Sequence, residues 1–271
     1  MKDNIGDRLK NYYENRSKTF LTRKIPVIIR VDGKCFHNFC KRFKKPYDEF
    51  LNNSLNKVMQ FLCQNIQGAK MAERHSDEIS ILLTDYDNVN TDCWFDYNVQ
   101  KTCSIAASIA TSEFCKILAF ESFKSKYDGD KKNISWEESW PIFDARCFNL
   151  PEHEINNYFY WRMLDAKRNS ISMVAQANFS HKSLQGLNSN QMQEKLWQEK
   201  QINWAKLPQG QKIGFICIKE KILKSISEGQ NTGEMVERHN WIIKESPSSK
   251  TELDNQIKLI KFFENNDSDV L

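Results

Sequence analysis

The chain has 271 residues and a formal net charge of +4 at pH 7, with 40% hydrophobic and 27% charged residues. This composition is typical of a soluble globular protein, and the length allows one large domain or two small ones. No apolar run approaches the ~18 residues that cross a bilayer, and the N-terminus carries acidic residues where a signal peptide has an apolar segment. We therefore expect no membrane partner and a cytoplasmic location, with an organelle as the alternative. The modest positive charge permits a nucleic-acid partner without requiring one.

The first half of the chain alternates between strand-like and helix-like segments. Residues 7–20 predict an amphipathic helix with Leu9, Tyr12, Tyr13 and Phe20 on its apolar side. The β-branched run that follows predicts a strand covered on both faces. The predicted elements from there on are a strand over 25–31, a helix over 46–66, two short strands within 69–87, a helix over 98–120 and a strand over 143–150. This βαββαβ order predicts an α+β fold of the ferredoxin-like type, an antiparallel sheet with helices on one face.

The second half of the chain is expected to extend this unit. Helical spacing marks residues 153–176 and 189–201, and the segment KIGFICIKEKIL predicts a strand. From about residue 225 the chain is polar, with a loop at SPSSK before a last helix over 252–264. We therefore expect residues 1–150 to form the main domain with its N-terminal helix. Residues 151–271 are expected to form helical extensions packed on it, in one compact body.

Two acidic residues occupy strand ends in this layout. Asp32 ends the first predicted strand, and Asp77 lies in the turn that joins the second and third. Because the first and third strands of a ferredoxin-like sheet are adjacent, the two carboxylates should lie close together and repel each other unless a cation bridges them. Mg²⁺ prefers carboxylate and carbonyl oxygens, and Gly33 exposes its carbonyl beside Asp32. Paired carboxylates of this kind hold the two metal ions of polymerases, so the pattern predicts nucleotidyl transfer.

A structural role for the same residues stays open at this point. Acidic residues at strand ends are common turn formers, so either aspartate alone favours a structural role, and only the pair gives chemistry equal standing. Ser76 is either a phosphate-binding hydroxyl or a turn residue. Glu78 is expected to point to the opposite face of the sheet from Asp77.

Six segments, taken in order, are similar to one known family. RVDGKCFHNF, KKPYDE, HSDEIS, QKTCSIAAS, FDARCFNLP and YFYWRMLDAKRNSI resemble the tRNA-His guanylyltransferase family, and the likeness covers about residues 1–215. The resemblance implies a polymerase palm that adds nucleotides to the 5′ end of tRNA in the 3′-to-5′ direction. It implies two Mg²⁺ ions, ATP for activation of the 5′ end, GTP or other nucleoside triphosphates as substrates, and a homotetramer built from dimers. The 3′-hydroxyl of the incoming nucleotide would attack the activated end and release AMP or pyrophosphate.

The resemblance also implies roles for particular residues. The metal ligands would be Asp32, the Gly33 carbonyl and Asp77, and the catalytic set would be Asp32, Asp77 and Lys101. Lys45 and Lys101 match lysines that hold phosphates, as point charges suit a polyphosphate. The nucleotide-binding set would be Asp32, Gly33, Lys34, Cys35, Phe36, His37, Lys45, Ser76, Asp77, Asn169 and Asn203.

Without the resemblance, several of these residues have ordinary interpretations. His37 after a strand would be a hydrogen-bonded structural histidine, and Lys101 would be a surface lysine on a helix. The aromatic segment YFYW at 158–161 favours the core over a platform for stacking bases.

One segment departs from the pattern of the eukaryotic enzymes that add a guanosine to tRNA-His. Those enzymes carry a His-Ile-Asn-Asn motif after the Trp-Arg segment. Here Lys167, Arg168, Asn169 and Ser170 occupy the aligned positions, so only the asparagine is retained. The "guanylyltransferase-like" branch of the family lacks the motif and repairs 5′-truncated tRNAs against the opposite strand. Template-dependent 5′ repair is therefore the first interpretation, and dedicated guanosine addition to tRNA-His is the alternative.

Two other classes of protein compete with this interpretation. A nucleotide cyclase with a palm fold would use the same paired acids without RNA, but the loop KKPYDE and the basic second half argue against it. A non-catalytic tRNA-binding protein would not need both acids, Gly33 and Lys101 together. Retention of labelled tRNA on a filter separates the cyclase from the other two classes, because a cyclase should not bind tRNA. Asp32→Ala and Asp77→Ala separate the enzyme from a binding protein, which should keep its function in both variants.

Overall fold

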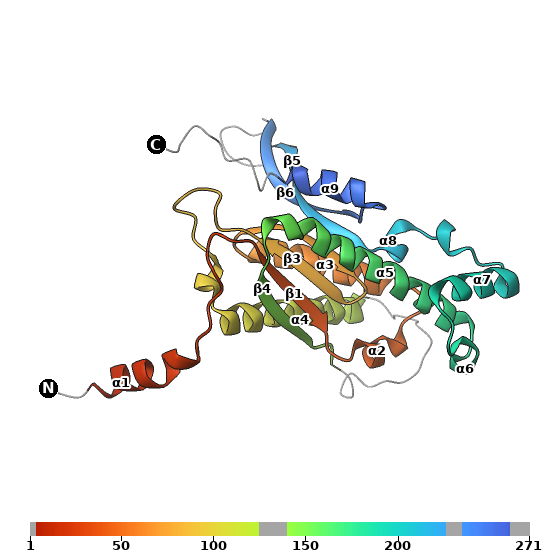
Figure 1. Cartoon of the computed structure of the whole chain (residues 1–271), viewed down its shortest axis with the longest axis horizontal. Helices are drawn as coiled ribbons and strands as arrows, with labels where there is room; N and C mark the ends of the chain where they lie inside the picture. The colour runs from red at the N-terminus through yellow and green to blue at the C-terminus, as the bar shows by residue number, and fades with distance from the viewer. Residues whose placement is uncertain (1–3, 125–139, 226–234, 261–271) are drawn as a thin grey trace.

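Apolar strands form the centre of the sheet in the computed structural model, which describes residues 4–124, 140–225 and 235–260 (Figure 1). The described strands make one six-stranded antiparallel sheet in the order β4-β1-β3-β2-β5-β6. Their bounds are β1 Val27–Gly33, β2 Ala69–His75, β3 Glu78–Leu83, β4 Phe143–Asn149, β5 Phe215–Ser225 and β6 Met235–Glu245. The order β4-β1-β3-β2 is that of the ferredoxin-like unit, so the predicted fold class is confirmed.

Helices connect the strands and continue after them. The longer helices are α1 Ile5–Tyr12, α3 Glu49–Asn65, α4 Val99–Lys124, α5 Ile155–Asn178, α7 Ser189–Lys200 and α9 Lys250–Leu259. Short helical turns are α2 Phe36–Phe39, α6 His181–Leu184 and α8 Gln209–Lys212, with 3₁₀ turns at Glu14–Ser17, Cys40–Arg42, Trp94–Tyr97, Glu152–Glu154 and Trp204–Lys206. The described part of the last helix ends at Leu259, and the end expected near residue 264 lies outside the described residues.

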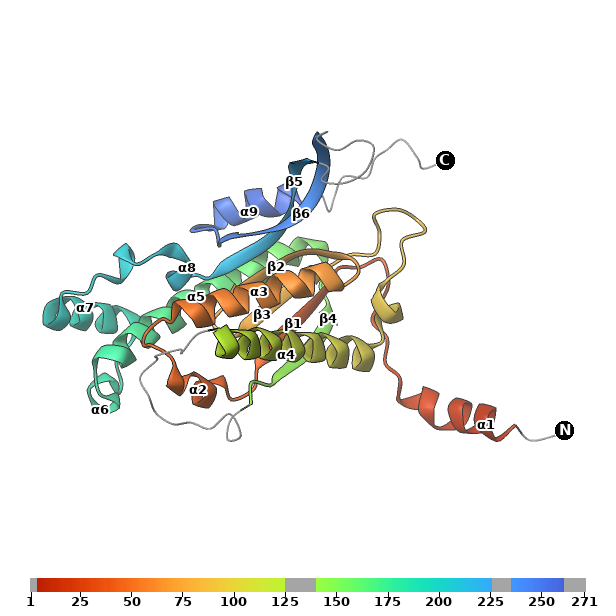
Figure 2. The same ribbon diagram turned by 180° about the vertical axis from the view of Figure 1, so that it is seen from behind.

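The two faces of the sheet are covered by different pairs of helices (Figures 1 and 2). Side chains alternate along β1, so Ile29 and Val31 face α3 and α4, while Ile28 faces α5 and α9. The expected helices on one face are α3 and α4, and the C-terminal helices add a second layer. Among the described residues, one helix is apolar and long enough to cross a membrane, the segment Val99–Phe120 of α4. Its residues Ala110 and Phe114 are buried in the core with α3 and the sheet.

The N-terminal helix is shorter than the predicted 7–20. It ends at Tyr12 because Tyr13 leaves helical geometry, with φ −125° and ψ −66°, and a 3₁₀ turn follows. The described part of the chain leaves its apolar side chains Ile5, Leu9 and Tyr12 exposed, and Tyr13 and Phe20 after it are exposed as well. The helix projects from the body of the molecule (Figure 1).

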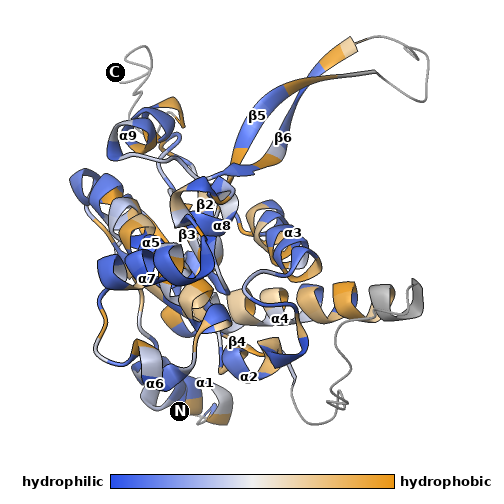
Figure 3. Cartoon of the chain, turned by 90° about the vertical axis from the view of Figure 1, so that its right-hand side faces the viewer, coloured by the Kyte–Doolittle hydropathy of each residue, from blue (hydrophilic) through white to orange (hydrophobic). Residues whose placement is uncertain are grey.

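The C-terminal extension supplies strands as well as helices. β5 pairs with β2 and β6 pairs with β5, so the sheet continues beyond the ferredoxin-like unit. The strand β6 was not expected, since the sequence after residue 225 was interpreted as polar chain. Its buried residue Trp241 packs in the same core as α3. The outer part of the β5–β6 hairpin projects from the body (Figure 3).

Candidate active site

The structure brings Asp32, Gly33 and Asp77 together at one end of the central strands. Asp32 and Gly33 close β1, and Asp77 lies in the turn between β2 and β3, next to β1 in the sheet. A Cβ atom added to Gly33 would lie 2.5 Å from Oδ2 of Asp77 and 2.4 Å from the Phe36 ring. Only glycine therefore lets the β1 backbone and the Asp77 carboxylate approach this closely.

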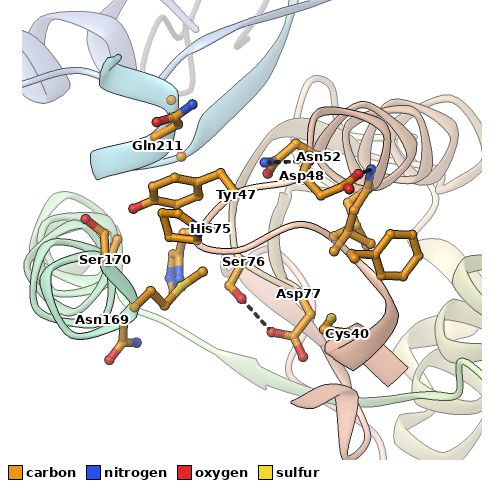
Figure 4. A pocket seen from close by; sticks show the side chains of 18 of the residues that line it. Cys40, Tyr47, Asp48, Asn52, His75, Ser76, Asp77, Asn169, Ser170 and Gln211 are labelled. Carbon is orange, nitrogen blue, oxygen red and sulfur yellow. Dashed lines mark hydrogen bonds between the residues drawn. The ribbon is translucent and has the colours of Figure 1, made fainter. Parts of the chain in front are cut away.

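The turn that carries Asp77 is locally ordered by its neighbour. Ser76 adopts the left-handed conformation with φ +51°, which turns the chain between the two strands. Its hydroxyl donates a 2.9 Å hydrogen bond to Oδ1 of Asp77 (Figure 4). The hydroxyl and the carboxylate are thus presented side by side at the turn.

The two aspartates lie where burial and mutual repulsion oppose ionisation, and the charges of Arg30, Arg146 and Arg74 compensate for this only in part. Burial raises the pKa of Asp77 above its ordinary value, repulsion from Asp32 raises it further, and the Ser76 hydrogen bond opposes the rise. Burial also raises the pKa of Asp32, with repulsion from Asp144, its direct neighbour across β1 and β4, as the next cause. A bound cation would relieve both effects.

These residues fit a magnesium site that relies on ligands from outside the protein. Two carboxylates and the Gly33 backbone carbonyl match the oxygen preference of Mg²⁺, which keeps waters or phosphate oxygens in its other positions. Among the described residues no group of three or more His, Cys, Asp or Glu side chains is placed to hold a metal ion. The chemistry of the donor set therefore fits Mg²⁺ held jointly by the protein and a polyphosphate.

A cavity of about 300 Å³ opens on one side of the turn, between α3, α5 and the 210–214 segment (Figure 4). Six of the predicted nucleotide residues line it: Phe36, His37, Lys45, Ser76, Asp77 and Asn169. Phe36 is only 3% exposed and packs against other phenylalanines, so it shapes the wall, whereas the side chains of His37 and Lys45 are exposed.

A second hollow, of about 430 Å³, lies on the α5 side of the same turn. Asp32 lines this hollow, and Ser76, Asp77 and Asn169 line both. The turn at residues 75–77 therefore stands between two spaces, each of which reaches the Asp77 carboxylate.

Besides Gly33, four predicted site residues lie outside both spaces. Lys34 and Cys35 directly follow Gly33 and are exposed, with Cys35 in the left-handed conformation. Asn203 caps a short 3₁₀ turn by accepting a hydrogen bond from the Ala205 amide. Its neighbour Trp204 donates a hydrogen bond to the Ser170 hydroxyl.

Lys101 is the fourth, and the structure does not bring it to the carboxylates of its own chain. The hydroxyl of Thr111 on α4 accepts a hydrogen bond from the amide of Phe143, the partner of Gly33 across the sheet. Lys101 precedes Thr111 by ten residues of continuous helix, which is ~15 Å along the axis. Its ammonium group instead lies 5.0 Å from the centre of the Phe95 ring. The sequence predicts that Lys101 lies on this helix, but it does not show which end of the helix lies near the carboxylates. The role of Lys101 therefore stays a prediction.

Other residues line the cavity that the sequence did not single out. Tyr47 and Asn52 come from the loop before α3 and its first turns, and Gln211 and Lys212 come from α8 (Figure 4). Tyr47 and Asn52 lie within or just after KKPYDE, so the family segment already pointed to their neighbourhood. Gln211 and Lys212 belong to a polar segment with no signal of its own, and they reach the cavity because β5 pairs with β2.

The Glu78 side chain lies on the face of the sheet that the alternation of side chains predicted. It accepts hydrogen bonds of 2.7 and 2.8 Å from the Arg162 guanidinium on α5, on the face opposite α3 and α4. Arg162 also pairs with Asp165, and both line the second hollow. Arg162 thus anchors α5 to the start of β3.

Comparisons with known proteins show the family to which the chain belongs. The family model described as tRNAHis guanylyltransferase matches residues 6–151, which includes both aspartates and Lys45. The chain is similar to a bacterial tRNA(His) guanylyltransferase-like protein solved with ATP, at 39% identity and TM-score 0.79, over 94% of this chain and 98% of that one. A structure of such a bacterial protein with GTP matches at 37% identity and TM-score 0.74, over 95% and 99%. The tRNA(His) guanylyltransferase of Saccharomyces cerevisiae matches at 26% identity and TM-score 0.61, over 76% and 91%. The chain therefore belongs to the tRNA(His) guanylyltransferase family and is a tRNA nucleotidyltransferase.

Proposed function

We propose that this chain extends 5′-truncated tRNAs in the 3′-to-5′ direction, using the opposite strand as template. The observation that carries the proposal is the likeness to bacterial guanylyltransferase-like proteins over 94% of the chain, against 76% for the yeast enzyme. The second candidate function is dedicated addition of one guanosine to tRNA-His, which the same family performs.

The segment 167–170 supports the first candidate. Lys167 donates a hydrogen bond to the backbone oxygen of Ser248, and Arg168 pairs with Asp165. Both side chains are occupied outside the cavity, and only Asn169 and Ser170 line it. The family's four-residue motif for guanosine addition is thus reduced to one retained asparagine at the cavity wall.

The residues of the site suit particular tasks. Asp32, the Gly33 carbonyl and Asp77 would hold two Mg²⁺ ions, which would neutralise the polyphosphate and activate the attacking hydroxyl. Lys45 lines the cavity and would bind phosphate oxygens as a point charge, and Ser76, whose hydroxyl donates to Asp77, lines the same cavity. The two spaces on either side of residues 75–77 would receive the incoming nucleotide and the activated 5′ end of the RNA. Attack of the nucleotide's 3′-hydroxyl on the 5′ α-phosphate would then release AMP or pyrophosphate.

A comparison of two RNAs tests the proposal. One is a tRNA that lacks its first 5′ nucleotide, and the other is a full-length tRNA-His that lacks only the extra guanosine. We expect faster extension of the truncated tRNA in the presence of Mg²⁺, ATP and all four nucleoside triphosphates. Asp77→Ala serves as the blank and should keep its tRNA affinity within about threefold, because affinity depends chiefly on phosphate contacts made by Lys and Arg. Preferential addition of one guanosine to tRNA-His would overturn the repair assignment in favour of the second candidate.

We also propose that the chain works as a homotetramer. The uncovered apolar side chains of α1, among them Leu9 and Tyr12, support an assembly that buries them. Light scattering on the purified protein measures the mass directly, and a monomer at micromolar concentration would contradict the proposal.

A further inference from the structure

Arg74 is a buried cation directly before the turn that carries Ser76 and Asp77. It lies on β2, is 1% exposed and donates three hydrogen bonds. Nη1 donates to the Ser76 backbone oxygen at 2.6 Å, Nε to Asn56 Oδ1 at 2.8 Å, and Nη2 to Asn52 Oδ1 at 3.3 Å. Each of these acceptors is neutral, so the hydrogen bonds satisfy the guanidinium without cancelling its charge. Such a residue is costly to bury and calls for a reason other than packing.

The bond from Arg74 to the Ser76 carbonyl acts on the geometry of the turn. Ser76 is a non-glycine residue in the left-handed region, a conformation that costs about 1 kcal/mol and persists only where surrounding contacts impose it. The guanidinium fixes the Ser76 peptide from inside the protein, and Asp77 is the next residue. The direction of the Asp77 carboxylate is therefore set partly by Arg74.

The same guanidinium is connected to the loop that carries Lys45. Asn52, which accepts from Arg74, donates its own amide to the Asp48 backbone oxygen at 3.1 Å. The Asp48 carboxylate accepts from the Lys44 amide at 3.1 Å and from the Leu51 amide at 2.9 Å. A continuous chain of hydrogen bonds thus runs from the turn at residues 76–77 to the loop at residues 44–48, across one wall of the cavity.

The C-terminal extension completes the enclosure of Arg74. Phe215 of β5 pairs with Arg74 in the sheet, and its ring lies 5.1 Å from the guanidinium carbon. Gly214 has φ +96°, and a Cβ atom there would lie 2.0 Å from the Arg74 backbone oxygen. This glycine permits the extension to approach β2 directly behind the turn. The extension therefore helps to keep water away from the guanidinium.

We propose that Arg74 is a positioning residue of the transfer site, which holds the Ser76–Asp77 turn in register with the Lys45 loop through Asn52 and Asn56. Without it, the Ser76 carbonyl and the two asparagine side chains lose their donor, and the turn is released to other conformations. A positive charge that acts on the buried Asp77 carboxylate is lost as well. The proposal rests on the nucleotide and metal roles assigned to Asp77 and Lys45 above.

Three variants test the proposal. Arg74→Lys keeps the charge but cannot reach three acceptors, and Asn52→Ala removes one link between turn and loop. Gln60→Ala is the matched control: Gln60 lies on the same helix α3 and donates to the Trp241 backbone oxygen, far along the helix from the site. Each variant is examined for its melting temperature, for Mg²⁺-dependent ATP binding without RNA, and for amide hydrogen exchange at residues 75–78 in metal-free protein.

The expected results separate positioning from stability. Arg74→Lys should weaken Mg²⁺-dependent ATP binding by about tenfold because it disturbs all three hydrogen bonds of the guanidinium. Asn52→Ala should weaken it by about threefold because it removes only one of them. Both should speed exchange at residues 75–78. Gln60→Ala should lower the melting temperature by as much as Asn52→Ala does, yet leave ATP binding and exchange at the turn unchanged.

Two outcomes would overturn the proposal. One is a folded Arg74→Lys protein with unchanged ATP affinity and unchanged exchange at residues 75–78. The other is an equal loss in Gln60→Ala, which would reduce the effect to general destabilisation. Because no RNA is present, a failure of the repair assignment leaves this result standing. If Asp77→Asn binds Mg²⁺ and ATP normally, the metal assignment fails, while the exchange measurement still reports whether Arg74 holds the turn.

Discussion

Lys45 and Lys101 carry the same charge but lie in different surroundings. Lys45 lines the cavity beside the turn that carries Asp77. Lys101 lies on the part of α4 that is distant from this turn, with its ammonium group over the Phe95 ring. We predict that Lys45→Ala weakens binding of Mg²⁺–ATP by about tenfold, and that Lys101→Ala changes it by less than about twofold, as for an isolated surface charge. Calorimetric titration of both variants checks this. An equal loss in the two variants would mean that a second copy of the chain carries Lys101 into the site.

Glu73 is a buried acid that no described residue satisfies fully. It is 3% exposed, its Oε2 has no hydrogen-bond partner among the described residues, and burial raises its pKa to about 8. In the unfolded chain Glu73 has its ordinary pKa of about 4. Between this pH and about 8 the folded chain therefore keeps a proton on Glu73 that the unfolded chain has released. The free energy of unfolding should consequently fall as the pH rises between these values, by up to about 1 kcal/mol per pH unit.

Glu73→Gln removes this titration while keeping the shape of the side chain. We expect the variant to gain stability relative to the parent as the pH rises from about 5.5 to 7.5. Urea unfolding at several pH values measures the difference. A difference that stays constant over this range would contradict a buried proton on Glu73.

The sequence points to the two aspartates that the structure brings together, but not to Arg74, which we propose orients one of them. Asp32, Gly33 and Asp77 could be predicted, because strand ends and glycine leave a pattern along the chain. Arg74 could not, because its acceptors belong to residues 52, 56 and 76 and meet only when α3 packs on β2. Lys101 shows the opposite case: its segment matches the family, but its distance from the carboxylates depends on the direction of α4.

Asp48 caps helix α3 and also holds the loop that carries Lys45. Its buried carboxylate accepts from the Leu51 amide at the helix start and from the Lys44 amide in the loop. We predict that Asp48→Ala lowers the free energy of unfolding by about 1–2 kcal/mol, as expected for a lost N-cap, and weakens ATP binding as well.

Ser249→Ala is the control for this cap. Ser249 caps α9 through the Glu252 amide, away from the cavity. Its removal should cost about 1 kcal/mol of stability and leave ATP affinity unchanged. Equal ATP affinities in the two variants would show that the cap at Asp48 serves stability alone.

The strands differed in how well the sequence revealed them. β1 and β3 are apolar runs because they are buried on both faces, so they were predicted. β6 reads MVERHNWIIKE, with Trp241 as its one buried residue and a mostly exposed outer half, so its alternation is weak. It is a strand because β5 offers it an edge along its whole length. That pairing is a tertiary contact that local pattern does not encode.

The molecule as a whole builds its cavity from both halves of the chain. The first half supplies the turn that carries Asp77 and the loop that carries Lys45, and the second half supplies α5 and the segment 210–214. The ferredoxin-like unit could be predicted because its order of elements and its apolar strands are visible in sequence. The contribution of the C-terminal extension could not, since it reaches the site only through the pairing of β5 with β2. This is the physical reason that a truncated palm should not retain the full site.

Template dependence of nucleotide addition is tested by changing the nucleotide opposite the missing 5′ position. Two truncated tRNAs are prepared that differ only in the nucleotide opposite the missing 5′ position, and each is incubated with Mg²⁺, ATP and all four nucleoside triphosphates. We predict that the added nucleotide changes to the complement of the opposing base in each RNA, and that Asp77→Ala adds none. Addition of guanosine to both RNAs, whatever the opposing base, would contradict it.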